Sequence, residues 1–412
     1  MEEWKEYKLG DLIVLSSGGT PNKSNSSYWG GDIPWISAKA MYDDYLYSSD
    51  MTITREGLNN GSKLAPVNSI LLLTRGSGLF NRIPVCLVKR EMAFNQDVKC
   101  IESINQNIVS TLFLFYWLMG NKQEISNILE TTGIGAGKID TERLKGIHIK
   151  LPPIQIQQVL IKFAESLMLK IEVNRRINDN LEQQAQALFK SWFVDFEPFK
   201  DGEFVESELG MIPKGWRVGI LNELGDIVGG STPSKAKPEY YTNNGIAWLT
   251  PKDLSISQRK FTSKGEIDIT QEGYESCSTK LMPKGSVLFS SRAPIGYITI
   301  AKNDICTNQG FKSVIPKFAG TAFLYCFLKE STQEIENKAT GSTFKEASGT
   351  LMKSLPAIIP EKAVLDDFEN LLSPLFCQQE VVEEENTLLS SLRDSLLPRL
   401  MSGELNVSEI NV

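Results

Sequence analysis

Polar loop motifs recur at matching places in the two halves of this 412-residue chain. Gly18-Gly19-Thr20-Pro21 is answered by Gly230-Ser231-Thr232-Pro233, and Asn95-Gln96 is answered by Asn308-Gln309. A glycine turn with a threonine hydroxyl and backbone N–H groups can bind a phosphate, and amide side chains can hydrogen-bond to the edge of an adenine. Both motifs also have a structural interpretation, because glycines shape turns and buried amides satisfy backbone groups. The second loop reads Gly-Gly-Ser-Thr-Pro, so its full equivalence with the first is open.

Cationic side chains accompany these motifs at the ends of predicted loops and strands. The stretch 64–75 matches 281–292, which predicts Arg75 and Arg292 at the tips of hairpins. Two glycine loops, 132–138 and 340–345, each end in a lysine. Cationic donors in such loops can contact phosphates or base edges of DNA. The candidate DNA-binding residues are Thr20, Lys23, Lys39, Arg75, Asn95, Gln96 and Lys138 in the first half and Thr232, Lys235, Lys252, Arg292, Asn308, Gln309 and Lys345 in the second.

Motifs for catalysis or cofactor binding are weak in this sequence. The glycines of Gly133-x-Gly135-x-Gly137 resemble an S-adenosylmethionine motif, but that motif needs a preceding strand, and 124–130 is predicted to be helical. The stretch 97–99 is a poor nuclease pattern, and its counterpart, 310–312, has no carboxylate. His148 is the only histidine, and no cysteine pair has metal-ligand spacing. We therefore expect no catalytic residue, no metal site and no cofactor on this chain, which is predicted to be a binding scaffold.

Two long helices are predicted to position these loops. The first covers 151–199 and begins with a proline pair, and the second covers 359–403, where Pro374 is predicted to kink or split it and Pro398 and Gly403 to end it. Apolar residues follow a 4,3 spacing in both, which is typical of helices that pair as an antiparallel coiled coil and act as a spacer; two amphipathic helices that only pack into a core are the alternative. The predicted contact positions are Ile156, Leu160, Phe163, Leu167, Ile177, Leu181 and Leu188, with Lys170, Asn174 and Gln184 in the same register, and Val364, Phe368, Leu371, Leu375, Val382, Leu389, Leu392 and Leu396.

The internal repeat predicts an α+β fold with two similar domains and two long helices. A chain of this length exceeds one ordinary hydrophobic core, and each half has room for one domain and one helix. The predicted segments are a first domain at 1–150, a helix at 151–199, a linker at 200–214, a second domain at 215–358 and a helix at 359–403.

Charge is distributed unevenly along the chain, whose net charge is −7. Residues 206–358 hold 18 Lys/Arg and 15 Asp/Glu, whereas residues 359–412 hold 3 and 11. The globular segments can therefore approach phosphates, and the acidic last helix is predicted to avoid DNA or to face a basic protein. The six cysteines form no disulfide pattern, and no apolar run is long enough for a membrane span, so a reduced cytoplasm is the expected location.

The whole chain resembles the specificity subunit of type I restriction-modification systems. The resemblance rests on the glycine loops, on Leu-Pro-Pro before the helix, and above all on the stretches 191–198 (SWFVDFEP) and 209–216 (LGMIPKGW). It implies that each domain reads one half of a two-part DNA target, and that the helices set the spacing and dock two modification subunits. It also implies that S-adenosylmethionine, ATP and Mg are bound by partner subunits, among them the restriction subunits, and not by this chain.

The stretch 191–198 and the helix contact positions supply candidates for partner binding. These candidates are Leu181, Leu188, Trp192, Phe193, Phe196, Leu389 and Leu396. A different class of function remains open, namely a scaffold that holds two protein clients apart without DNA. An enzyme that acts alone is a third possibility, and binding of S-adenosylmethionine by the isolated chain would favour it.

Overall fold

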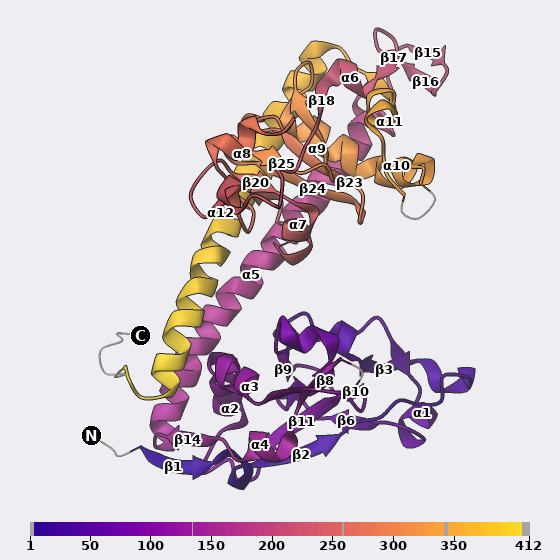
Figure 1. The fold of residues 1–412 in the computed structure, drawn as a ribbon. Helices are drawn as coiled ribbons and strands as arrows, with labels where there is room; N and C mark the ends of the chain where they lie inside the picture. The colour runs from indigo at the N-terminus through magenta and orange to yellow at the C-terminus, as the bar shows by residue number, and fades with distance from the viewer. Residues whose placement is uncertain (1–3, 134, 258, 342–344, 406–412) are drawn as a thin grey trace. The chain divides into compact units, whose positions relative to one another are not determined.

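The computed structural model describes residues 4–133, 135–257, 259–341 and 345–405. The chain folds into two compact units (Figure 1). Unit 1 consists of Met1–Ile171 and Leu388–Val412, and unit 2 consists of Glu172–Thr387. Each unit thus joins one globular domain to a part of each long helix, a division that segments drawn along the sequence did not anticipate.

A five-stranded sheet forms the centre of the domain in unit 1. Its middle strands are apolar runs that are buried on both faces, as expected where a helix, here α2 (Thr111–Gly120), covers the sheet. The order is β2 (Ile13–Ser17), β11 (Val98–Ser103), β7 (Ile70–Leu73), β9 (Val85–Val88) and β4 (Tyr45–Leu46). A four-stranded sheet has the order β5 (Thr52–Ile53), β3 (Trp29–Ile36), β10 (Met92–Phe94) and β6 (Lys63–Ala65). The other elements are β12 (Leu129–Thr131), β13 (Gly137–Ile139) and β8 (Arg75–Gly76) in one sheet, the pair β1 (Lys5–Lys8) and β14 (His148–Leu151), and the helices α1 (Arg55–Asn59), α2 (Thr111–Gly120), α3 (Lys122–Asn127) and α4 (Thr141–Lys145).

Unit 2 repeats the topology of the five-stranded sheet. Its five-stranded sheet has the matching order β18 (Gly225–Gly229), β26 (Lys312–Pro316), β23 (Val287–Ser291), β24 (Ile295–Ala301) and β21 (Phe261–Thr262). In both sheets only the last strand runs parallel to its neighbour. The other strand pairs are β20 (Trp248–Leu249) with β25 (Cys306–Thr307), β19 (Tyr241–Thr242) with β22 (Asp268–Ile269), β17 (Arg217–Ile220) with β27 (Pro356–Ile359), and β15 (Phe204–Ser207) with β16 (Gly210–Pro213), the last within the predicted linker. The short helices are α6 (Leu221–Leu224), α7 (Pro251–Ser257), α8 (Gln271–Glu275), α9 (Thr321–Glu330), α10 (Thr332–Lys338) and α11 (Gly349–Lys353).

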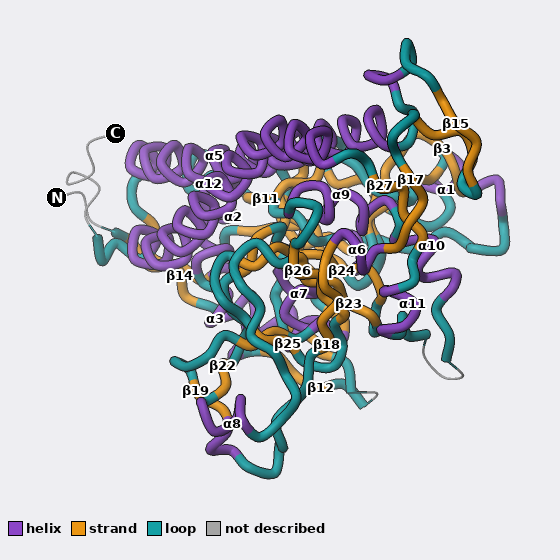
Figure 2. Tube along the Cα trace, turned by 90° about the horizontal axis from the view of Figure 1, so that it is seen from above, coloured by secondary structure: helices purple, strands orange, loops and turns teal. Residues whose placement is uncertain are grey.

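The two long helices are α5 (Ile154–Phe193) and α12 (Lys362–Met401), each of 40 residues. In unit 2 they lie side by side and antiparallel (Figures 1 and 2), since Asn174 contacts Glu385 near one end of the pair and the Phe189 ring lies 6.1 Å from that of Phe368 near the other. In unit 1 the remaining segments share one core, in which Leu160 and Leu400 are both fully buried. The predicted α+β class with repeated domains and long helices is therefore confirmed.

The helix boundaries differ from the prediction at several proline positions. Helix α5 begins after the proline pair, because Leu151 still belongs to β14, and it ends at Phe193, because Phe196 adopts a left-handed backbone. A split at Pro374 is wrong, since α12 continues through this residue, and a kink there stays a prediction. Pro374 is exposed, so water can hydrate the carbonyl that loses its N–H partner. Pro398 also lies inside α12, and Gly403, with a φ of +78°, follows its end.

The buried face of α5 is rotated from the predicted 4,3 register. Leu160, Asn174 and Leu181 are buried as predicted, but Lys170 and Gln184 are exposed. The buried positions are Gln157, Leu160, Ile161, Ala164, Met168, Ile171, Asn174, Leu181, Ala185, Phe189 and Phe193. This face drifts because a straight helix has 3.6 residues per turn and because α5 packs against a domain as well as against α12. Among the described residues, no helix combines the length and the apolar character that crossing a membrane requires.

Candidate nucleic-acid interface

One side-chain contact joins the two predicted loop motifs in both units. Thr20 Oγ1 donates a hydrogen bond to Gln96 Oε1 at 2.7 Å in unit 1. Thr232 Oγ1 donates the equivalent bond to Gln309 Oε1 in unit 2. The sequence separation is large in each case, so the sheets of each domain bring the two motifs together. The contact between the two motifs is thus present in both units, although the sequence predicted only that each motif recurs.

The backbone of the glycine loop settles its equivalence between the units. Trp35 Nε1 donates to the carbonyl of Gly19, and Trp248 Nε1 donates to that of Ser231, both at 3.1 Å. The backbone N–H groups of the same two loop residues bind the carbonyls of Phe94 and Thr307. Gly19 therefore corresponds to Ser231. The additional serine in the second motif does not shift the threonine.

The asparagines of the repeated Asn-Gln motif have a structural role. Asn95 Oδ1 accepts the backbone N–H of Asp97 at 3.2 Å, and Asn308 Oδ1 accepts that of Gly310 at 2.8 Å. Both bonds close a turn by reaching two residues along the chain. Gln96 and Gln309 are exposed instead, so the glutamines are the amides that can reach a ligand.

A concave surface in unit 2 gathers all but one of the candidates from the second half. It encloses about 820 Å³, and Trp248, Tyr241 and Pro251 contribute its apolar lining. Lys345 does not line it, since its Nζ donates to the carbonyl of Glu336 at 3.3 Å. The candidates on this surface are Thr232, Lys235, Lys252, Arg292, Asn308 and Gln309. Lys252 is paired with Glu266 at 2.7 Å, and this hydrogen bond raises the pKa of Lys252.

The four cationic candidates of unit 1 fall into two groups. Arg75 and Lys138 lie directly opposite each other in the pairing of β8 with β13. Arg75 thus begins a short strand, whereas Arg292 occupies the turn between β23 and β24, as predicted for a hairpin tip. Lys23 and Lys39 are exposed, and the structure gives neither side chain a partner among the described residues.

Two further lysines, Lys99 and Lys312, lie opposite the residue that precedes the glycine loop of their unit. Sequence reasoning did not name them as DNA-binding candidates. Lys99 pairs in register with Ser17 and donates from Nζ to Ser17 Oγ at 2.5 Å, and Lys312 pairs in register with Gly229. Burial lowers the pKa of Lys99, and Arg75 lowers it further. A usable signal was present, because each lysine follows its Asn-Gln motif at the same spacing.

The described residues of the glycine loop 132–138 follow β12, and its last two, Gly137 and Lys138, begin β13. The prediction that 124–130 is helical fails at its end, because β12 begins at Leu129. The next strand, β13, returns antiparallel to β12, whereas a nucleotide motif leads from a strand into a helix. Within the described ranges, no group of His, Cys, Asp and Glu side chains has the arrangement of metal ligands.

The family-model comparison decides the family of the chain. Residues 1–183 and 213–380 match the model of the type I restriction modification DNA specificity domain. The chain belongs to this family. The match covers most of both halves, so it also supports the repeat of specificity domains seen in the two units.

Proteins with similar sequences match part or nearly all of the chain. The MjaIX specificity subunit of Methanocaldococcus jannaschii is 40% identical over 192 residues, which span 44% of this chain and 44% of that protein. The HindI specificity subunit of Haemophilus influenzae is 27% identical and covers 98% of this chain and 100% of its own length. The crystal structure of a type I S subunit from M. genitalium covers 97% of this chain and 96% of its own, with 15% identity and a TM-score of 0.54, and shares the fold. The relatives are specificity subunits and not methyltransferase or restriction subunits, which supports the prediction of a chain without catalytic function.

The partner-binding candidates of this specificity-domain chain are largely part of its own cores. Phe193 is 7% exposed, and its ring lies 4.8 Å from that of Phe368 and 4.9 Å from that of Phe323. Leu181 is buried as well. Leu188, Trp192, Phe196, Leu389 and Leu396 are half-buried. Partner binding by these residues stays a prediction, and the burial of Phe193 favours a role in folding.

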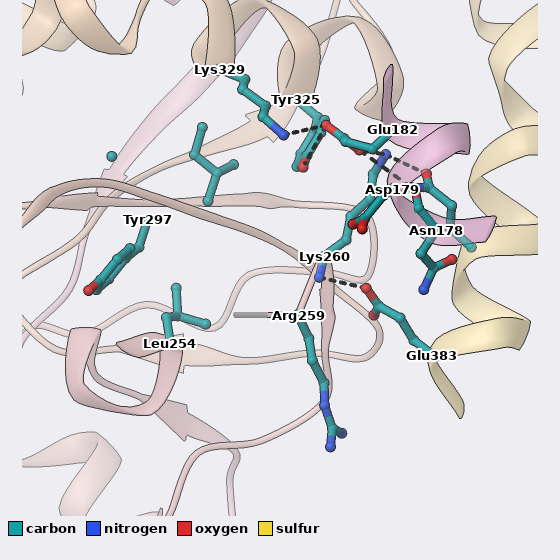
Figure 3. A pocket seen from close by; sticks show the side chains of 13 residues that line it. Asn178, Asp179, Glu182, Leu254, Arg259, Lys260, Tyr297, Tyr325, Lys329 and Glu383 are labelled. Atoms are coloured by element: carbon teal, nitrogen blue, oxygen red, sulfur yellow. Dashed lines mark hydrogen bonds and ion pairs between the residues drawn. The ribbon is translucent and has the colours of Figure 1, made fainter. Parts of the chain in front are cut away.

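A polar cluster attaches the domain of unit 2 to both long helices. Lys260 Nζ binds Glu182 of α5 at 2.8 Å and Gln379 of α12 at 2.7 Å, and it lies 3.3 Å from the centre of the Phe376 ring. Figure 3 shows this cluster, with Lys329 and Tyr325 of α9 directed toward Glu182, at a cavity of about 430 Å³. Burial alone would raise the pKa of Glu182, but Lys260 and Lys329 lower it to about 2. Sequence reasoning missed this cluster because its members come from four distant segments.

Replacing Gly230 by alanine is expected to disrupt the loop that presents Thr232. A Cβ at Gly230 would lie 2.2 Å from the carbonyl oxygens of Thr307 and Asn308, and backbone atoms cannot move aside cheaply. We expect Gly230→Ala to destabilise the chain by about 1–3 kcal/mol, the usual range for overpacking, and to weaken DNA binding. Gly229→Ala is the matched control, since its nearest neighbour would be Lys312 Cδ at 3.9 Å. Thermal unfolding and a mobility-shift assay compare the two, and equal behaviour would contradict the steric argument.

Proposed function

We propose that this chain is the DNA sequence-recognition subunit of a type I restriction-modification complex. The domain of unit 1 reads one half of a two-part target, and the domain of unit 2 reads the other. The observation that carries the proposal is the repeated contact between the glycine loop and the Asn-Gln turn, at matching places in matching sheets of a specificity-domain chain. A protein with one binding site would not need two copies of the same contact between the glycine loop and the Asn-Gln turn.

The ligand on this proposal is double-stranded DNA, and the partners are two modification subunits and the restriction subunits. S-adenosylmethionine, ATP and Mg belong to those partners. The concave surface of unit 2 supports DNA as the ligand, because it combines exposed cations with hydroxyl and amide groups, the types that contact phosphates and base edges. The helices α5 and α12 set the spacing of the half-sites. We also propose a cytoplasmic location, which suits six cysteines that are all free thiols.

Methylome sequencing of domain-exchange chimaeras tests the division into two reading domains. Residues 215–358 are replaced by the matching segment of the HindI relative, and the chimaera is expressed with the modification subunits. We expect one half of the methylated sequence to change while the other half is retained, because the domain of unit 1 is untouched. The reciprocal exchange of residues 1–150 should change the opposite half. A chimaera that methylates a target with both halves altered would contradict the proposal.

A mobility-shift assay separates this proposal from a protein scaffold that does not contact DNA. The assembled chain and modification subunits are titrated against duplex DNA over a series of salt concentrations. DNA recognition predicts binding that weakens steeply with salt, because neutralised phosphates release counterions. A scaffold predicts assembly with partners and no DNA shift at any salt concentration.

A further inference from the structure

The structure shows which residue of the second half is equivalent to Lys138 in the internal repeat. In unit 1 the backbone N–H of Ile139 donates to the carbonyl of Thr74 at 2.9 Å. In unit 2 the N–H of Ala347 donates to the carbonyl of Ser291, also at 2.9 Å. The residues that precede these donors are Lys138 and Glu346. Lys138 therefore corresponds to Glu346. The ends of the two glycine loops in the sequence had suggested Lys345 instead.

The surroundings of this position are otherwise the same in the two units. Arg75 follows Thr74, and Arg292 follows Ser291. Lys99 and Lys312 hold the same register position, opposite the residue that precedes the first glycine of the loop. Each unit thus has an arginine and a lysine at matching strand ends. The third charge is reversed, positive in unit 1 and negative in unit 2.

In unit 1 the third charge is positive, so Arg75, Lys99 and Lys138 form a group of three cations. Lys138 lies opposite Arg75, and Arg75 is close enough to Lys99 to add to the effect of burial, which lowers the lysine pKa. Within the part of unit 1 that the structure describes, none of these three side chains forms an ion pair with a carboxylate. Asp97 near Lys99 and Asp140 near Lys138 offset part of this charge without forming an ion pair with these lysines. Like charges held close by strand pairing cost free energy, which a bound anion would offset.

In unit 2 the chain supplies that anion itself. Glu346 Oε2 lies 3.5 Å from Arg292 Nη1, and its Oε1 lies 3.4 Å from Lys312 Nζ. The Glu346 side chain is 38% exposed, so the carboxylate is at the surface and bridges the two cations there. The Glu346 carboxylate occupies the position that an external anion would take between Arg292 and Lys312, and it therefore excludes such an anion.

We propose that Arg75, Lys99 and Lys138 form a binding site for a DNA backbone phosphate in unit 1, and that Glu346 occupies the corresponding anion position in unit 2. The inference rests on the proposed function and adds an asymmetry to it. The domain of unit 1 holds its half-site with an additional phosphate contact that is independent of sequence. The domain of unit 2 depends more on its concave surface. The site lies beside the glycine loop 18–21, because Lys99 donates a hydrogen bond to Ser17, the residue before that loop.

Two neutral substitutions with opposite expected signs test the asymmetry. Lys138→Gln and Glu346→Gln are each assembled with the modification subunits and titrated with one random-sequence duplex between 50 and 400 mM salt, roughly the range in which such binding changes steeply. Lys138→Gln should flatten the dependence of log K on log salt by about 0.9 and weaken binding about eightfold at 0.1 M salt, as expected for one lost phosphate. Glu346→Gln should steepen the dependence and strengthen binding by a similar factor, since it releases Arg292 and Lys312.

Matched controls separate this site from a general effect of net charge. Lys145→Gln and Glu334→Gln make the same charge changes at exposed residues that are paired with Glu142 and Lys338. If each test variant behaves like its control, or if Glu346→Gln weakens binding, the inference is wrong. A wild-type complex that shows no salt-dependent DNA binding would instead overturn the proposed function.

Discussion

Lys260→Met is expected to destabilise unit 2 by about 3–5 kcal/mol, the cost of removing one partner from a buried ion pair. The Lys260 side chain is only 5% exposed, and that of Glu182 is 19% exposed. Methionine can fill most of the volume between the rings of Phe376 and Tyr325, but it leaves the Glu182 carboxylate without its closest buried cation. The loss is therefore electrostatic and not a loss of packing.

Lys329→Met is the matched control for this prediction. Lys329 also binds Glu182, at 2.5 Å, but its side chain is 42% exposed. Solvent screens an exposed pair, so we expect the control to lose no more than about 1 kcal/mol. Urea unfolding of the two variants and the wild type gives the comparison, and equal losses would show that burial does not set the strength of the pair.

The dependence of stability on pH gives an independent test of the same pair. The pKa of Glu182 is about 2 in the folded chain, below the value of about 4.3 for an unfolded glutamate. A depressed carboxyl pKa contributes stability above the unfolded pKa, and this contribution is lost as the pH falls through the folded pKa. The difference between wild type and Lys260→Met should therefore be full near neutral pH and shrink between about pH 4 and pH 2. A difference that stays constant over that range would contradict the electrostatic explanation.

The equivalent position in unit 1 shows why the sign of this charge matters. Asp44 precedes β4 as Lys260 precedes β21, and it binds Arg393 of α12 at 3.4 Å, with both side chains 15% exposed. Both domains thus attach to the long helices through an ion pair, but the signs are exchanged. Lys260→Asp, which installs the unit 1 residue in unit 2, should be more destabilising than Lys260→Met, because it adds a carboxylate beside Glu182.

Phe193→Ala is expected to destabilise the chain by about 3–5 kcal/mol, the usual cost of truncating a buried phenylalanine. The ring of Phe193 contacts those of Phe323 and Phe368, and it also lies 5.8 Å from that of Trp216. This aromatic cluster joins the end of α5 to α9 and α12 in unit 2. Removal of the central ring leaves a cavity that rigid neighbouring rings cannot fill.

The same variant decides between the two roles of the stretch 191–198. Val194→Ala is the control, because Val194 is 44% exposed and its truncation creates no cavity. Thermal unfolding measures stability, and co-purification with the modification subunits below the melting temperature measures assembly. A folding role predicts a lowered melting temperature for Phe193→Ala with assembly retained. An unchanged melting temperature with lost assembly would assign Phe193 to the partner interface.

Local sequence patterns were sufficient for the repeat and the fold class. Apolar runs such as 70–73 and 287–289 lie in the buried strands, and the glycine and Asn-Gln motifs recur at matching places in both halves. These features follow from short-range physics, since strand propensity, turn chemistry and the need to bury apolar side chains act within a few residues.

The tertiary structure decided which residues face one another. The matching of Lys138 with Glu346 depends on backbone hydrogen bonds between distant strands, and loops that differ between the halves conceal it in the sequence. The buried face of α5 depends on the domain that packs against it, so Lys170 and Gln184 are exposed despite their register. Lys260 is buried only because α5 and α12 bring Glu182 and Gln379 to it. In each case the contact that stabilises the arrangement is made with a residue far along the chain. A local pattern of residue types does not specify such a contact.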